Sequence, residues 1–196
     1  MHRESGAPLS CHGKDRDVIE RDRLHGMLKI SNELEGGDRR DLGGLSLEVV
    51  FAPGHTIGCL ALYIPERQAL FTTDTVMAVS TTSINVNDGS LADYMQTLDA
   101  FKEIDARIMY TGHGGPVKDP AGRLDALIRH RHEREAAILT ALKEGPQTPA
   151  ELRTRIYSGL PQSREKIAER QLVTTLSKLI DDDAVVRSED EKYSLL

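Results

Sequence analysis

The sequence lacks tryptophan, and aromatic residues make up only 4% of its 196 residues. A hydrophobic core must therefore be built mainly from aliphatic side chains and methionine. No apolar stretch approaches the roughly 20 residues that a membrane-spanning helix needs, so we expect no membrane insertion. Two cysteines, Cys11 and Cys59, are too few for a disulfide framework or a cysteine-rich zinc site. The N-terminus also lacks an apolar signal region, and we therefore expect a cytoplasmic protein.

The chain also lacks a basic region. Residues 1–120 carry the whole net charge of −6, and residues 121–196 are neutral overall. A surface that binds nucleic acid normally concentrates lysine and arginine. We therefore do not expect DNA binding, and the charge of residues 1–120 disfavours a basic channel for RNA.

Strand-like alternation of apolar and polar residues begins at Leu45, after a glycine-rich stretch at 34–44 that predicts turns. The pattern predicts short strands at 45–50, 59–64, 69–71 and 107–110, and a helix at 91–104. Strands that alternate with a helix in this way are typical of layered α/β folds. We assign residues 1–120 to one α/β domain.

From Pro120 the pattern becomes mainly helical. It predicts helices at 121–143, 149–157 and 164–180 and two strands at 184–187 and 192–195. Thr148 and Glu151 have the spacing of a capping box, with Pro149 at the first helical position. Three helices followed by a hairpin are typical of a winged helix, and we assign residues 121–196 to such a domain.

Three predicted strands end in a side chain that can bind a metal, namely His55, Asp74 and His113. Loops at strand ends converge on one edge of an open sheet, where sites are commonly built. Two imidazoles and a carboxylate suit zinc or another borderline divalent metal. Each residue alone is more often a surface or turn residue, but the three together, in this order, predict a metal site.

The motifs around these residues resemble those of the metallo-β-lactamase-fold hydrolases. Pro53-Gly54-His55-Thr56-x-Gly58 resembles the third histidine motif of that family, and Gly112-His113-Gly114 resembles its final histidine motif. The run 70–74, Leu-Phe-Thr-Thr-Asp, resembles the strand whose aspartate bridges two metals. Further similarity at 76–82, 94–98 and 128–135 points to the branch with a C-terminal winged helix. That branch includes the lactamase-beta-like endoribonuclease and bacterial and fungal hydrolases, some of them thioesterases.

This resemblance implies the C-terminal half of an αββα sandwich followed by a winged-helix domain. It also implies hydrolysis of an ester, a thioester or a phosphodiester by metal-bound hydroxide, with one or two zinc ions as cofactor. His55 would bind the first metal, His113 the second, and Asp74 both; Asp74 would also orient the hydroxide and so act as the catalytic carboxylate. The implied substrate is a small-molecule ester or thioester, or RNA.

The sequence departs from the family pattern at several points. The family signature His-x-His-x-Asp-His is absent, and residues 1–12 resemble the stretch that usually follows it. We therefore expect a fragment or a natural truncation that binds zinc weakly and hydrolyses poorly by itself. Thr73 also stands where the family usually has glycine, and an extra Gly115 precedes Pro116.

The text His130-Arg131-His132 matches His-x-His, but it lies in a helical pattern where positions two apart face different directions. We expect His132 to be solvated and His130 to be a packing residue.

Two functions of another class stay open. One is a non-catalytic interaction or dimerisation module, in which the chain forms a homo-oligomer through its winged helix or an open sheet edge. The other is a winged-helix DNA-binding regulator, which is weaker because Glu165 and Glu169 offset Arg164, Lys166 and Arg170.

Overall fold

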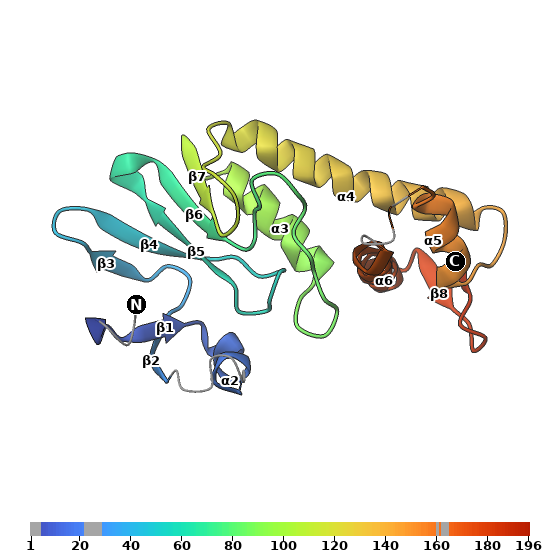
Figure 1. The fold of residues 1–196 in the computed structure, drawn as a ribbon, viewed down its shortest axis with the longest axis horizontal. Coiled ribbons are helices and arrows are strands. Elements are labelled where there is room, and N and C mark those ends of the chain that lie inside the picture. The colour runs from blue at the N-terminus through green and yellow to red at the C-terminus, as the bar shows by residue number, and fades with distance from the viewer. Residues whose placement is uncertain (1–4, 22–28, 160, 162–164) are drawn as a thin grey trace.

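The computed structural model describes residues 5–21, 29–159, 161 and 165–196. Its centre is a five-stranded sheet in the order β3-β4-β5-β6-β7 (Figure 1). The strands are β3 (Arg39–Asp41), β4 (Ser46–Phe51), β5 (Leu60–Ile64), β6 (Ala69–Thr73) and β7 (Ile108–Thr111), with a short 3-10 helix η1 (Pro65–Arg67) between β5 and β6. The layered α/β arrangement predicted from the sequence is confirmed.

The directions of the strands decide where their ends lie. Strand β5 is antiparallel to both β4 and β6, so β4 and β6 run in the same direction. Strand β7 is parallel to β6. The carboxyl ends of β4, β6 and β7 therefore lie at one edge of the sheet, and the residues that follow these three strands are brought to that edge.

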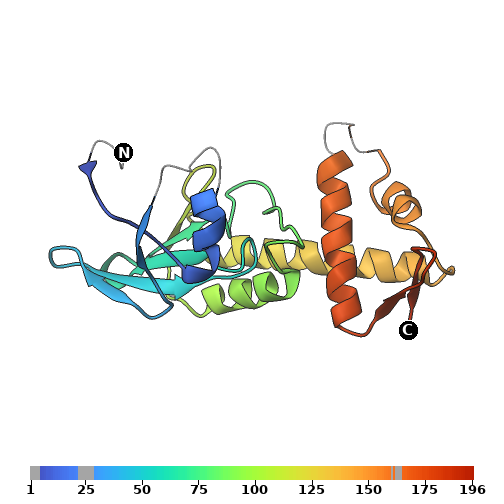
Figure 2. The same ribbon diagram turned by 90° about the horizontal axis from the view of Figure 1, so that it is seen from below.

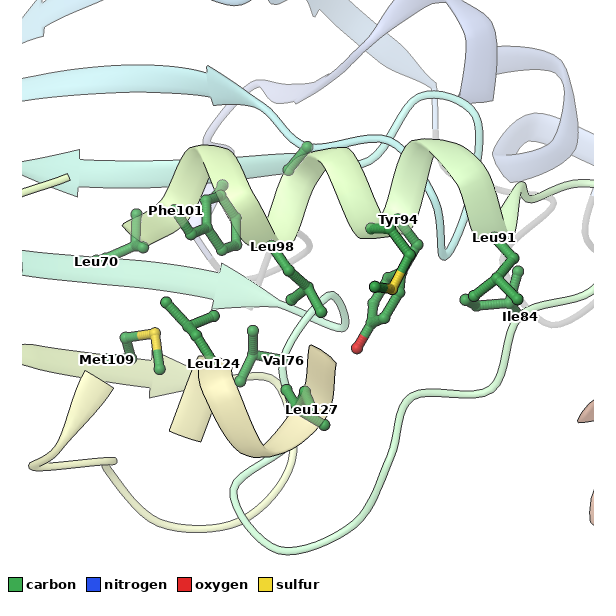
Figure 3. Close-up of a cluster of buried hydrophobic side chains, with 13 residues drawn as sticks. Leu70, Val76, Ile84, Leu91, Tyr94, Leu98, Phe101, Met109, Leu124 and Leu127 are labelled. Carbon is green, nitrogen blue, oxygen red and sulfur yellow. The ribbon is translucent and has the colours of Figure 1, made fainter. Parts of the chain in front are cut away.

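Helices α3 (Leu91–Lys102) and α4 (Pro120–Leu142) contribute to a core with one face of this sheet (Figure 3). The hydroxyl of Ser90 caps α3 by accepting a hydrogen bond from the Asp93 N–H, 3.1 Å away. Apolar residues at helical spacing then turn one stripe of α3 inward. Fully buried side chains of the core include Leu70, Tyr94, Leu98, Met109, Leu124 and Leu127.

Two aromatic side chains mark the other face of the sheet. Because side chains alternate along a strand, Phe71 and Tyr110 point away from the face to which their neighbours Leu70 and Met109 belong. Their rings stack with centroids 4.9 Å apart, and the residues are 36% and 39% exposed.

The N-terminal part contains elements that the sequence did not predict. Strand β1 (Leu9–Cys11) pairs in parallel with β2 (Ile30–Glu33), and helix α2 (Gly13–Arg21) lies on the side of the sheet opposite α3 (Figure 2). The prediction of turns at 34–44 was wrong for Arg39–Asp41, which forms β3. All three residues of β3 are exposed, so the strand has no apolar alternation and depends on pairing with β4.

Helix α4 continues beyond the sheet into a second core, which it shares with α5 (Pro149–Ile156), α6 (Glu165–Asp181), β8 (Val185–Arg187) and β9 (Tyr193–Leu195). The predicted capping box is confirmed, with the Thr148 side chain bonded to the Glu151 N–H and the Glu151 side chain bonded to the Thr148 N–H. Arg164 lies outside the described residues. Since α4 contributes to both cores, a division at residues 120 and 121 stays a prediction. Within the described ranges, every helix is too short or too polar to cross a membrane.

Candidate metal centre

Two of the three predicted ligands are in contact at the carboxyl edge of the sheet. Nε2 of His113, after β7, lies 3.4 Å from Oδ1 of Asp74, after β6. Their contact follows from the parallel pairing of β6 and β7, which aligns Thr73 with Thr111. Their side chains are 46% exposed for Asp74 and 69% exposed for His113, so water and solutes reach the pair.

The backbone around Asp74 has a special conformation. Thr73 has a φ of 48°, in the left-handed region that is costly for a β-branched residue. This is the position where a glycine is usual in the family that the sequence resembles, and the geometry gives the physical reason. The Thr73 hydroxyl donates a hydrogen bond to the Leu60 carbonyl at 2.9 Å, which helps to hold the strained residue.

Gly112 allows His113 to approach Asp74. A Cβ atom at position 112 would collide with the Asp74 carboxylate and would lie only 3.0 Å from the Thr73 carbonyl. A side chain at this position would displace the Asp74 carboxylate and crowd the Thr73 backbone, so glycine lets the β7 loop approach closely.

His55 lies in the loop between β4 and β5, and its ring is oriented by a backbone group. Its Nδ1 is 2.8 Å from the carbonyl oxygen of Ser83. A carbonyl can only accept a hydrogen bond, so Nδ1 carries the proton and Nε2 of the neutral ring keeps its lone pair. Metal-binding histidines commonly donate their other N–H to a carbonyl in this way.

Helix α2 holds the same loop from the other side. The Asp15 carboxylate accepts hydrogen bonds from the Thr56 hydroxyl at 2.5 Å and from the Gly58 N–H at 3.0 Å. The loop that carries His55 is thus anchored on both sides of the histidine.

The donor chemistry of the three residues fits zinc, but their geometry is incomplete. Asp74 and His113 form a pair, whereas no group of three or more histidine, cysteine, aspartate or glutamate side chains in the described part of the chain is arranged to hold a metal. Catalytic zinc sites usually have three protein ligands and an open position. The contacting pair alone is therefore smaller than the ligand set of such a site.

The two histidines of the His-x-His sequence lie on α4. His132 is exposed, as predicted. His130 is half-buried, and burial lowers the pKa of its imidazole, with a further lowering by the guanidinium groups of Arg131 and Arg134. Its environment is that of a packing residue.

Sequence reasoning missed three residues that support the centre: Asp15, Ser83 and Arg131. Asp15 and Ser83 act through contacts between distant segments, for which the sequence has no local signal. Arg131 did have one: Leu124, Leu127, Arg131 and Ile138 fall on one apolar helix stripe, where an arginine is out of place. Arg131 is 2% exposed, and its guanidinium lies over the Tyr94 ring at 5.2 Å.

Comparisons with known proteins agree with this architecture. The model of the metallo-beta-lactamase superfamily matches residues 6–113, and that of the beta-lactamase associated winged helix domain matches residues 148–193. A metallo-beta-lactamase family protein from Thermus thermophilus has the same fold, with a TM-score of 0.82, 21% identity and coverage of 99% of this chain and 73% of that one.

Two curated relatives extend the comparison. The beta-lactamase-like protein 2 homolog of Caenorhabditis elegans is 28% identical over 89% of this chain and 58% of its own length. The atrochrysone carboxyl ACP thioesterase of Aspergillus fumigatus is 31% identical over 60% of this chain and 40% of its own length. The chain thus spans about half the length of the curated relatives that it matches. Because the superfamily model covers more than half of its residues, the chain belongs to the metallo-beta-lactamase superfamily and carries a beta-lactamase associated winged helix domain.

Proposed function

We propose that this protein is a metal-dependent hydrolase in which His55, Asp74 and His113 contribute zinc ligands. The observation that carries the proposal is the contact of 3.4 Å between His113 Nε2 and Asp74 Oδ1 at the sheet edge that also receives the His55 loop. A bound metal would supply the activation of water for attack on the substrate. The chain's own residues provide an exposed carboxylate and imidazole pair and an imidazole whose Nε2 is left available by the Ser83 contact.

We propose an acyl ester or thioester as the substrate. One relative is named as an atrochrysone carboxyl ACP thioesterase, and the net charge of −6 in residues 1–120 does not favour a long anionic substrate such as RNA. RNA stays the alternative substrate, and hydrolysis of a labelled RNA, side by side with an acyl thioester, separates the two.

The incomplete ligand geometry predicts how strongly the chain binds zinc and how fast it turns over substrate. With one contacting pair among its described residues, the chain alone should bind zinc weakly and turn over slowly. Zinc content after gel filtration and dialysis, together with a titration of the apoprotein, measures this. We expect a substoichiometric zinc content, and a reduced affinity in His55→Ala, Asp74→Ala and His113→Ala.

A matched control is available in His132→Ala, since His132 is an exposed histidine on α4. It should bind zinc as the unmodified chain does. Equal binding by the His113→Ala and His132→Ala variants would contradict the ligand assignment. Stoichiometric zinc retained with rapid turnover would contradict the weak-binding form of the proposal.

A non-catalytic dimerisation module is the second candidate, and one observation favours it. The stacked Phe71 and Tyr110 rings are exposed on the sheet face opposite α3, where a second copy of the chain could pack. Sedimentation of the chain and of a Phe71→Lys variant tests this. A dimer that forms equally with and without zinc, and that Phe71→Lys dissociates, would favour the dimerisation module over the hydrolase.

A further inference from the structure

One segment contacts all three candidate ligands. Residues 75–85, which we call the bridging segment, follow β6 and lead toward α3. The Ala78 N–H donates a hydrogen bond to the His113 carbonyl at 3.3 Å. The Thr82 hydroxyl lies 2.9 Å from the Asp74 carbonyl, to which it donates, and the Ser83 carbonyl accepts the Nδ1–H of His55.

The other side of the bridging segment is held by α4. Arg123 donates from Nε and Nη2 to the Met77 carbonyl at 3.0 and 2.8 Å. Nη2 of the buried Arg131 donates to the Thr82 carbonyl at 2.6 Å. Both arginines therefore bind backbone carbonyls of the segment, and a buried guanidinium is stable only when it has such partners.

Helix α6 holds the same segment at its far end. The Gln171 side chain donates to the Thr81 hydroxyl at 3.1 Å, and the Thr174 hydroxyl lies 2.9 Å from the Ile84 carbonyl, to which it donates. The Arg170 carbonyl, within α6, lies 2.8 Å from the same Thr174 hydroxyl, so the hydroxyl shares its one proton between α6 and the segment. Gln171 and Thr174 are both buried. These bonds join residues 90 positions apart, and the segment passes between the sheet layer and α6 (Figure 1).

Each of the four residues 81–84 contacts either a C-terminal helix or His55. Thr81 and Ile84 bind α6, Thr82 binds α4, and Ser83, between them, binds His55. The acceptor of the His55 ring is thus fixed by neighbours on both sides, and each neighbour is fixed by the helical C-terminal part.

We propose that the C-terminal helices position the His55 imidazole through the bridging segment, with Gln171 and Thr174 of α6 as positioning residues. The winged-helix part would then have a role in the centre without supplying a ligand to it. The importance of His55 for metal binding rests on the proposed function, whereas the orientation of its ring can be measured without a metal.

The test is ring nitrogen NMR of the ¹⁵N-labelled, metal-free full chain near neutral pH, with the His55 signals assigned from His55→Gln. The unmodified chain should show a single tautomer, with the proton on Nδ1. In Gln171→Leu/Thr174→Val we expect exchange between both tautomers. Zinc affinity in the same variant should fall about tenfold, as is common when a partner that orients a ligand is lost.

The chain offers a matched control on the same helix. The buried Thr175 hydroxyl donates to the Gln171 carbonyl within α6, so Thr175→Val removes a comparable hydrogen bond that does not reach the segment. It should keep the single tautomer, and Thr174→Ser, which keeps the hydroxyl, should keep it too. If the double variant does not fold, the single variant Thr174→Val is used for the same measurement.

The outcomes separate this inference from the proposed function. An unchanged tautomer in a folded Thr174→Val and in the double variant would overturn the positioning role, whatever the zinc affinity. Loss of the single tautomer in Thr175→Val as well would also overturn it, since the effect would then be general destabilisation. A tautomer change confined to the segment-contacting variants, in a chain that binds no zinc, would support positioning and contradict the metal function.

Discussion

The Asp15 carboxylate accepts a hydrogen bond from the Gly58 N–H at 3.0 Å, across 43 positions of sequence. With the Thr56 hydroxyl as its second donor, this carboxylate joins helix α2 to the loop that carries His55. The N-terminal part of the chain, in which the sequence predicted no helix or strand, therefore supports the candidate centre directly.

Replacing Asp15 by alanine should destabilise the fold by about 1–3 kcal/mol, because it leaves a partly buried N–H and a hydroxyl without their acceptor. Urea unfolding followed by circular dichroism measures this. Asp17→Ala is the matched control, since exposed Asp17 on the same helix pairs with Arg21 in a surface ion pair. An equal midpoint for the two variants would contradict the anchoring role of Asp15.

Replacing Gly112 by alanine should separate His113 from Asp74, because the new Cβ would occupy the space of the carboxylate. We expect a loss of about 1–3 kcal/mol in stability from overpacking and a clear loss of zinc affinity. Calorimetric titration and thermal unfolding measure the two effects. Gly115→Ala, in the same loop, adds a Cβ with nothing within 4 Å and should change neither; a loss of zinc affinity in both variants would contradict the steric argument.

Replacing Gly54 by alanine should cost more stability than replacing Gly37. Both glycines have a positive φ, 137° for Gly54 and 92° for Gly37, so both substitutions introduce backbone strain. Only at Gly54 would a Cβ also meet the backbone of Tyr94, 2.5 Å away, at the start of α3. The difference between the two unfolding midpoints isolates the contact between the His55 loop and α3, and equal midpoints would show that the contact is dispensable.

Stability should fall on acidification through the pKa of His130. Burial lowers this pKa, the positive charges of Arg131, Arg134 and Arg123 lower it further, and Glu133 opposes them. In the unfolded chain His130 titrates near its ordinary value of about 6.5. Between that pKa and the lower pKa in the folded state, the unfolded state binds more protons. The contribution of neutral His130 to the free energy of unfolding is therefore complete above about pH 6.5 and is lost as the pH falls.

The measurement is the free energy of unfolding in urea at several pH values below neutrality. His130→Gln cannot take up the proton and should lose less stability on acidification than the unmodified chain. His132→Gln is the control, because this exposed residue two positions away should leave the pH dependence unchanged. If the free energy of unfolding fell equally steeply with pH in the His130→Gln variant and in the unmodified chain, His130 would not be the group responsible.

The predicted strands from β4 onward and the helices α3 to α6 could be found because their signals are local. Apolar alternation marks β4, helical spacing marks α3, and Thr148 with Glu151 marks the start of α5. Strand β3 and helix α2 escaped prediction for the opposite reason. Strand β3 is wholly exposed, and α2 has no buried residue among its nine, so neither has an apolar pattern.

The sequence by itself determined the residue types at the strand ends, the family motifs around His55, Asp74 and His113, and the order of the helices. Only the tertiary structure decided which of these residues meet, because strand direction and register bring His113 to Asp74. It alone decided that Arg131, Gln171 and Thr174 hold the bridging segment, since these hydrogen bonds join residues 49 to 90 positions apart. Contacts at such separations leave no periodic signal in a single sequence, and they form only when the packing of the two cores has brought the helices to the segment.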